Sequence, residues 1–199
     1  MKKEDNRAKL KALAFDESIL NPVGDEVVRA VHTLPNQEFA FERYCQTEGV
    51  VVYLPLRRGL KIHNFAQKGR PYSYSREVLR PMFTSYAFVK MALPLLSTLH
   101  ASHAVAQILP LTYGQDRFLD ELRAVRTCET LGFEQELEVH QDILEGSRFR
   151  IVSGVWDGVE GRLTRKNGVF KWTVEIEMLS QFVTTVIDPT QFKMIPLDE

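Results

Sequence analysis

The stretch that decides the fold is MFTSYAFVKM, residues 82–91. Aromatic and β-branched residues alternate along it with period two, which is typical of a β-strand. Both of its faces are largely apolar, so we expect it to lie centrally in a sheet that helices cover on one side. Phe83, Tyr86 and Phe88 are then core residues. Alternatively, Phe83 and Tyr86 lie near the strand start and form an exposed apolar patch that marks an interaction site.

The neighbouring segments predict the rest of an α+β domain. Residues 27–31 predict a first strand, and Pro35 suits the first turn of a helix that Gly49 can end. Residues 50–54 predict a second strand. After residue 91, the pattern predicts a helix at 95–101, a strand at 104–111 and a helix from an N-cap at Asp116 to about Leu131.

Residues 57–80 are strongly basic, with seven Lys or Arg residues against the single acid Glu77. Gly and Pro interrupt this segment, and Tyr72 and Tyr74 lie among its charges. The pattern predicts an extended β-hairpin with a flexible basic tip. Two interpretations stay open. The charges only keep a solvated loop soluble, or they contact phosphate groups.

The chain changes character after residue 132. Residues 133–145 are rich in acids without a basic residue, which predicts a linker between two domains with few contacts. From Gly146 on, strands and turns alternate, and Asn167-Gly168 is a strong hairpin signal. About five short strands in this segment predict a small closed barrel, because an open sheet of this size would leave unpaired edge strands that can aggregate. The run FVTTVI, residues 182–187, is rich in β-branched residues, which predicts a barrel that does not refold as helices.

Composition excludes several classes of function. The 199-residue chain is 44% hydrophobic and 26% charged, with a net charge of −1, so its overall charge gives no sign of nucleic-acid binding. Two cysteines make no disulfide framework, and neither a signal peptide nor a membrane-length apolar run is present. The chain lacks GxSxG, HExxH, CxxC and phosphate-binding glycine motifs, and its histidines are scattered. We therefore expect a cytoplasmic, monomeric protein that is not an enzyme and has no cofactor, metal or membrane partner.

Three stretches resemble the NusG-type transcription elongation factors, in which an NGN domain is linked to a KOW domain. VHTLPNQE (31–38) resembles the first strand and helix start of the NGN domain, and MFTSYAFV (82–89) resembles a later strand. EGSRFRIVSGVWDGVEGRL (145–163) is similar to the KOW signature. Thr84-Ser85 stands where the family usually has Pro-Gly, and Val27-Val28 replaces its usual Trp-Tyr opening. With these departures the chain resembles a specialised paralogue of the RfaH or polysaccharide-operon kind.

The polar residues 1–25, broken by Asn21-Pro22 and Gly24, predict a flexible or partly helical tail that is extra to the family pattern. The resemblance implies an NGN domain with an antiparallel sheet flanked by helices (26–132), joined by the acidic linker (133–145) to a small SH3-like KOW β-barrel (146–196). It also implies binding rather than catalysis. The NGN domain would bind the β′ clamp helices of RNA polymerase and suppress pausing or termination by favouring the processive form.

The resemblance also implies site residues. The aromatic contacts with the clamp helices would be Phe83 and Tyr86, completed by Phe41 and Tyr44 unless these two are core residues. Contacts with the polymerase β gate loop or with non-template DNA would involve Ser97, Thr98, His100, Arg57, Arg58, Arg70 and Arg76. The KOW domain would bind ribosomal protein, Rho or RNA through Arg148, Arg150, Trp156, Arg162, Arg165 and Lys166, although Trp156 could instead plug the barrel.

A second hypothesis comes from the occurrence of KOW domains in ribosomal proteins. The chain would then be a ribosome-associated RNA-binding protein, with RNA affinity in its C-terminal half and none for polymerase. The NGN-like strand at residues 82–89 argues for the elongation factor.

Overall fold

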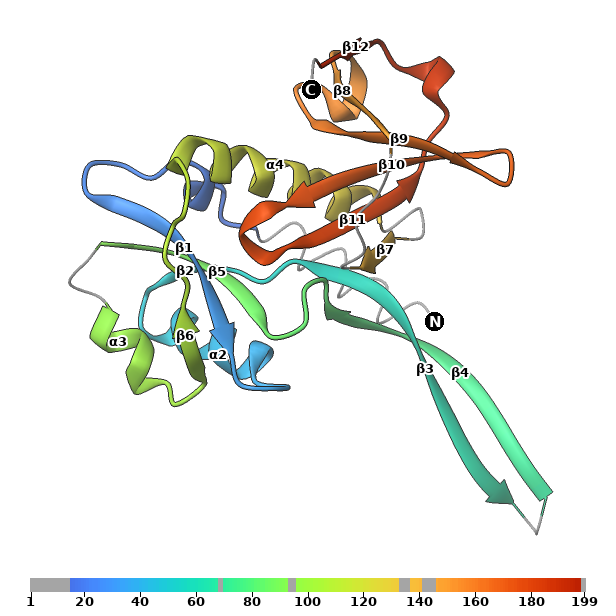
Figure 1. The fold of residues 1–199 in the computed structure, drawn as a ribbon. Coiled ribbons are helices and arrows are strands. Elements are labelled where there is room, and N and C mark those ends of the chain that lie inside the picture. Colours follow the sequence, from blue (N-terminus) through green and yellow to red (C-terminus); the bar gives the residue numbers. More distant parts are fainter. Residues whose placement is uncertain (1–14, 68–69, 93–95, 133–136, 141–145, 198–199) are drawn as a thin grey trace.

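The computed structural model describes residues 15–67, 70–92, 96–132, 137–140 and 146–197. It is a mixed α+β fold with antiparallel sheets and few helices (Figure 1). Residues 1–14 of the expected tail lie outside this description. In the described part of the tail, the 3-10 helix η1 (Glu17–Leu20) fits the partly helical alternative and contradicts the flexible one; the Asp16 carboxylate accepts the Ser18 N–H at 2.9 Å. Ile19 is fully buried, so core packing holds this segment in place.

A four-stranded sheet with the order β2-β5-β1-β6 forms the centre of the N-terminal half. Its members are β1 (Glu26–Thr33), β2 (Val51–Tyr53), β5 (Tyr86–Ala92) and β6 (Val105–Ile108). The strand β5 pairs with β1 on one side and β2 on the other, which confirms its predicted central position. Phe88 of β5 and its partner Ala30 of β1 point to one face of the sheet, whereas the next pair, Ala87 and Val31, points to the other.

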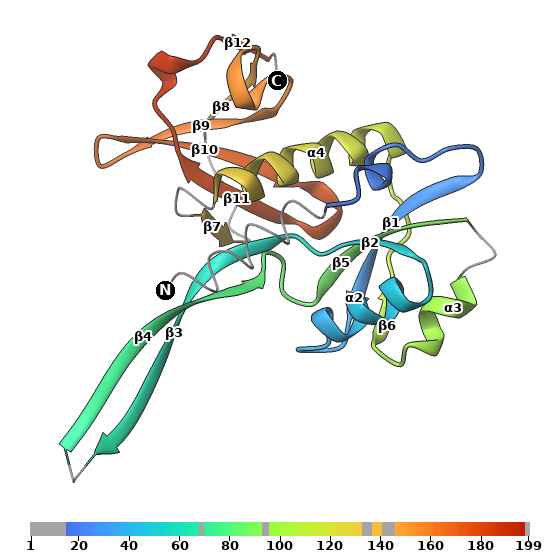
Figure 2. The same ribbon diagram turned by 180° about the vertical axis from the view of Figure 1, so that it is seen from behind.

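Helices cover both faces of this sheet rather than the one expected (Figures 1 and 2). On one face, α2 (Glu38–Thr47) and α3 (Leu96–Ala101) share a buried cluster with Val31 and Ala87. On the other, α4 (Gln115–Leu131) packs its apolar side against Phe88 and Ala30. The expected N-cap Asp116 is wrong. Gly114 occupies that position, and Asp116 lies in the first turn, where its charge suits the helix dipole.

The predicted basic hairpin is present. Its strands β3 (Leu56–Gln67) and β4 (Arg70–Pro81) pair without a break from Leu56–Pro81 to Gln67–Arg70. The hairpin extends well beyond the body of the molecule (Figures 1 and 2). Its expected flexible tip, residues 68–69, lies outside the described residues.

Residues 82–85 form a turn rather than the start of a strand. β5 begins only at Tyr86, whose N–H donates to the Phe83 carbonyl at 3.2 Å. Ser85 has a φ of 63°, in the left-handed region that non-glycine residues rarely adopt. Met82 and Phe83 both enter the core from this turn, so their apolar character extended the apparent period-two pattern beyond the strand.

The C-terminal half is a six-stranded sheet with the order β12-β8-β9-β10-β11-β7. Its members are β7 (Leu137–His140), β8 (Ser147–Ile151), β9 (Glu160–Lys166), β10 (Val169–Ile176), β11 (Gln181–Val186) and β12 (Met194–Pro196). The turn at Asn167 and Gly168 is confirmed, with φ values of 53° and 79°. Among the described residues no strand ladder joins β12 to β7. The small closed barrel that we expected is therefore not completed by strand pairing within this part of the chain.

The prediction of an acidic linker at residues 133–145 is partly wrong, because β7 lies inside this range and pairs with β11. Leu137 is buried against the core, and Glu138 accepts hydrogen bonds from the Lys171 ammonium at 2.8 Å. Alternating apolar residues between the acids therefore build an edge strand. Residues 133–136 and 141–145 of the expected linker lie outside the described residues.

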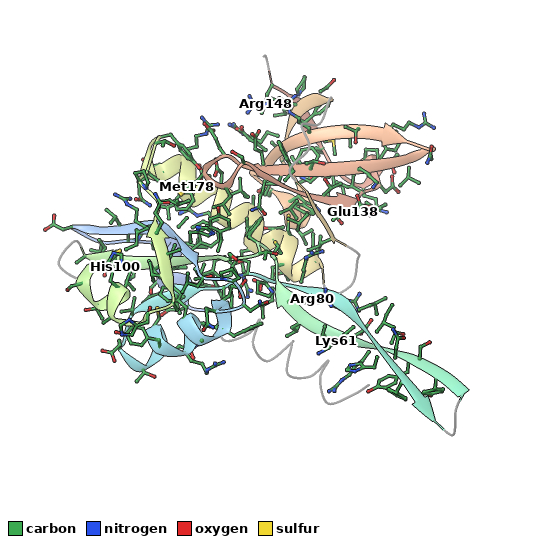
Figure 3. The ribbon with its side chains drawn as sticks, turned by 60° about the horizontal axis from the view of Figure 1, so that its bottom comes forward. Lys61, Arg80, His100, Glu138, Arg148 and Met178 are labelled. Carbon is green, nitrogen blue, oxygen red and sulfur yellow. The ribbon has the colours of Figure 1, made fainter. Side chains whose placement is uncertain are left out.

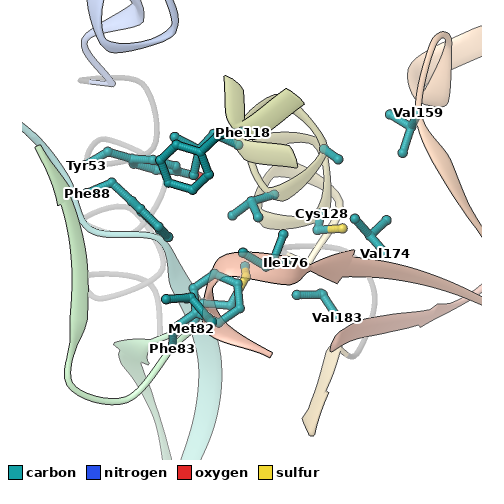
Figure 4. Packing of buried hydrophobic residues seen from close by; sticks show 14 of the residues in the cluster. Tyr53, Met82, Phe83, Phe88, Phe118, Cys128, Val159, Val174, Ile176 and Val183 are labelled. Carbon is teal, nitrogen blue, oxygen red and sulfur yellow. The ribbon is translucent and has the colours of Figure 1, made fainter. Parts of the chain in front are cut away.

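The two halves share one hydrophobic core, contrary to the expectation of independent domains. A single buried cluster contains Phe83 and Phe118 of the first half with Ile176 and Val183 of the second (Figure 4). Helix α4 lies between the two sheets and contacts β10 and β11 (Figure 1). Helix α4 therefore packs against both sheets, and Phe83 from the turn at 82–85 lies in the cluster that joins the two halves.

A buried carboxylate joins α4 to the base of the hairpin. Glu129 accepts the Leu56 N–H at 2.8 Å, the Tyr53 hydroxyl at 3.0 Å and the Arg126 guanidinium at 2.7 Å. Burial raises the pKa of Glu129, and its hydrogen bonds from Leu56, Arg126 and Tyr53 oppose that shift. This contact fixes where β3 leaves the body.

Candidate functional site

The expected aromatic patch at residues 83–86 is not exposed. Phe83 has 0% exposure and meets Phe88 edge-on, with ring centroids 6.1 Å apart. Tyr86 is half-buried and stacks on His32 at 4.9 Å. The prediction of a surface patch is therefore wrong for Phe83 in this conformation, and the core alternative is correct. The reason is the C-terminal sheet, which contributes Ile176 and Val183 to the same cluster.

Phe41 and Tyr44 do not complete a pocket with Phe83. Phe41 is fully buried in the cluster on the opposite face of the first sheet. Tyr44 is half-buried, and its hydroxyl donates to the Thr98 carbonyl at 2.8 Å, which ties α2 to α3. The core alternative therefore holds for Phe41, and Tyr44 has a structural hydrogen bond.

The polar residues of α3 form a separate surface. Ser97 and His100 are exposed, whereas Thr98 is half-buried (Figure 3). The helix lies beside β6 rather than beside the hairpin. The residues assigned together to gate-loop or DNA contact therefore occupy two surfaces.

The basic residues of the hairpin lie on both of its faces. Arg57 and Arg58 are half-buried near the base, and Arg58 pairs with Glu77 at 3.7 Å. Arg76 is exposed further along β4. Arg70 begins β4, and its side chain is outside the described part. Lys61 and Arg80 lie along the outstretched strands in Figure 3.

Sequence reasoning missed an aromatic cluster on this hairpin. His63 and Phe65 of β3 lie opposite Tyr74 and Tyr72 of β4. The sequence places both tyrosines among the charges but does not show that they share a face with His63 and Phe65. Their shared face follows from the hairpin register, which the alternation of each strand taken alone does not reveal.

The predicted KOW surface is largely engaged in internal contacts. Arg148 and Arg150 both pair with Glu160, the first at 3.5 Å. Arg162 donates to the Gly146 carbonyl at 3.0 Å, and the Arg165 guanidinium lies 5.1 Å from the Phe170 ring centroid. Lys166 ends β9, with its side chain outside the described part.

Trp156 belongs to this predicted surface but is buried in the 3-10 helix η3 (Gly154–Trp156). The expectation of an exposed Trp156 is therefore wrong, and its side chain belongs to the buried cluster that the two halves share. Its indole is not available to a partner in this conformation.

A polar contact also joins α4 to the C-terminal sheet. The Tyr113 hydroxyl donates to Glu121 at 2.6 Å and accepts the Met178 N–H at 3.1 Å. Arg117 forms an ion pair with Glu177 of the 3-10 helix η4 (Glu177–Leu179). Burial raises the pKa of Glu121 to about 7, against the hydrogen bond from Tyr113. The contact between the halves thus contains a carboxyl that titrates near neutrality.

Comparisons with known proteins give no relative. A scan against protein-family models finds no match, and a search of curated proteins finds none either. Within the described ranges, no group of three or more His, Cys, Asp or Glu side chains is placed to hold a metal ion. No helix in this part of the chain is long and apolar enough to cross a membrane.

Proposed function

We propose that the chain is a NusG-type transcription elongation factor that binds the clamp helices of RNA polymerase and suppresses pausing or termination. Under this proposal, the helix-covered antiparallel sheet is an NGN domain and the C-terminal sheet is a KOW domain. The three resembling stretches support it by their places in the fold. They lie on β1 and the start of α2, on the turn before β5, and on β8 to β9.

One observation carries the proposal furthest. Ser85 stands where the family motif usually has Gly, and its φ is 63°. Glycine adopts this left-handed conformation without the steric penalty that a Cβ brings. Ser85 thus has the positive φ that the Gly of a Pro-Gly turn would readily adopt, although the residues differ. This supports aligning MFTSYAFV with the family's strand.

The burial of Phe83 adds a condition to the proposal. If the clamp helices bind at Phe83, the C-terminal sheet must first separate from the turn at 82–85. Only the fraction of molecules in the separated state would bind, so the apparent affinity is lowered by that fraction. Polymerase would then select the separated state because it binds that state better.

The test measures binding of the full chain to an assembled bacterial elongation complex, with a β′ clamp-helix fragment as competitor. We expect binding that the fragment displaces. Arg117→Glu places a third carboxylate beside Glu121 and Glu177. Their mutual repulsion should favour separation of the C-terminal sheet from α4 and so raise the affinity for the elongation complex. Arg43→Glu is the control, because Arg43 is exposed on α2, away from Glu121 and Glu177.

A second variant locates the contact. Phe83→Leu keeps an apolar side chain in the core but removes the ring, and we expect weaker binding to the clamp-helix fragment. If neither the wild type nor Arg117→Glu binds polymerase, the proposal fails and the ribosome-associated alternative is favoured. Binding that is insensitive to Phe83→Leu would retain the function but exclude this site.

A further inference from the structure

The β3–β4 hairpin has two chemically different faces. Residues paired across an antiparallel ladder point to the same side, and successive residues of a strand alternate between sides. One side, which we call the ring face, carries the ladder pairs Arg57–Arg80, Gly59–Val78, Lys61–Arg76, His63–Tyr74 and Phe65–Tyr72. The opposite side carries Leu60, Ile62 and the Arg58–Glu77 ion pair.

The rings of the ring face are ordered against one another. His63 stacks on Tyr74 with centroids 4.9 Å apart and planes 10° from parallel. Phe65 lies 5.3 Å from Tyr72 and 5.5 Å from Tyr74. Phe65, Tyr72 and Tyr74 are nevertheless 45%, 54% and 41% exposed. These side chains contact their neighbours yet leave much of their surface open to a ligand.

Charge on this face favours an anionic ligand. Arg57, Lys61, Arg76 and Arg80 lie on it, and the hairpin's one acid, Glu77, is on the opposite side. Room for Arg80 comes from Gly59, because a Cβ there would lie 3.0 Å from the Arg80 Cδ. The Arg80 guanidinium donates to the Leu60 carbonyl at 3.0 Å, which holds it along the strand.

We propose that the ring face binds single-stranded nucleic acid. Unpaired bases stack on the exposed rings, while the cations nearer the base of the hairpin contact the phosphates. Aromatic platforms beside cationic grooves bind single strands in this way with little dependence on sequence. A duplex offers the cations its phosphates but keeps its base faces stacked internally. An apolar protein partner would make no use of the positive charge, and an acidic one would not require the rings. The inference does not depend on polymerase binding, because the rings lie on the part of the hairpin that extends beyond the body (Figure 1), whereas Phe83 is buried in the core.

The experiment measures fluorescence anisotropy of labelled single-stranded DNA and RNA of about 15 nucleotides, a typical site size, titrated with the full chain. We expect Phe65→Ala and Tyr74→Ala each to weaken binding about fivefold or more. Leu60→Ala and Ile62→Ala are matched controls, since both side chains are exposed and apolar but lie on the opposite face. We expect no change for these two variants.

Salt dependence tests the cationic part of the site. Lys61→Gln should reduce the slope of log affinity against log salt by about one unit. Arg43→Gln, an exposed cation on α2, should leave the slope unchanged. Far-ultraviolet circular dichroism establishes that each variant is folded.

The outcomes are distinct. Binding of only DNA or only RNA, with the ring dependence intact, supports the site and identifies its ligand. The proposal is overturned if neither strand binds, if duplex binds with the same ring dependence, or if the Leu60 and Ile62 variants lose as much as the ring variants. Polymerase binding is measured separately, so either proposal can fail without the other.

Discussion

Glu129→Ala tests how the hairpin is anchored to the body. Glu129 is 4% exposed and accepts hydrogen bonds from the Leu56 N–H, the Tyr53 hydroxyl and the Arg126 guanidinium. The substitution leaves a buried N–H and a buried hydroxyl without their acceptor and removes the anion beside Arg126. One unsatisfied buried group costs about 1–3 kcal/mol, and breaking a buried ion pair about 3–5 kcal/mol. Because Arg126 is partly exposed, we expect a total loss of about 3 kcal/mol.

Urea denaturation at pH 7 measures this loss directly. For a chain of this size, a loss of about 3 kcal/mol lowers the melting temperature by roughly 6–12 °C. Asp120→Ala is the control on the same helix, since Asp120 is largely exposed and pairs with Arg123 at 2.7 Å. The control should cost no more than about 1 kcal/mol. A Glu129→Ala loss no larger than the control would refute the anchoring role.

Three further predictions concern the C-terminal half, its contact with α4, and the cysteines. The pKa of about 7 for Glu121 exceeds its ordinary value of 4.5, so the stability from its protonated form is full below pH 4.5 and is lost as the pH rises through 7. Urea denaturation between pH 5 and 8 should therefore show a fall of about 1–3 kcal/mol that Glu121→Gln abolishes. Gly161→Ala should cost about 2 kcal/mol by the same measurement, because its Cβ would lie 2.6 Å from the Thr173 carbonyl oxygen and 2.8 Å from the Trp172 ring. Gly114→Ala, whose Cβ would have no atom within 4 Å, is the control and should cost less than about 1 kcal/mol, because Gly114 is the N-cap of α4 and alanine is a poor N-cap residue. The two cysteines should resist alkylation in the folded chain, since burial raises the pKa of each thiol to about 12.

Local signals predicted the elements whose causes are local. The Asn167-Gly168 turn was predictable because both residues tolerate positive φ, and they adopt it. Gly49 follows α2 with a φ of 69°, as its expected role at the helix end requires. The long hairpin followed from its alternation and its breaks. In each case the determining residues lie within a few positions of the structure they specify.

Predictions failed where distant segments decide the outcome. Phe83 looked like a patch because its own strand gave no sign of the C-terminal sheet that buries it. Phe41 was grouped with Phe83, but the two lie on opposite faces of the first sheet. Ile19 and Leu137 were placed in a tail and a linker because each lies in a polar context, yet both are core residues. Packing across the fold overrides local composition at these positions.

The ring face shows how much function can depend on register alone. In the observed pairing, odd-numbered residues of β3 share a side with even-numbered residues of β4, as in Phe65 with Tyr72. A one-residue change in that pairing would put Phe65 and His63 on one side and both tyrosines on the other. The composition of the hairpin would be unchanged, but its aromatic cluster would no longer exist. The two-residue connection between Gln67 and Arg70 is therefore as much a determinant of the proposed site as the rings themselves.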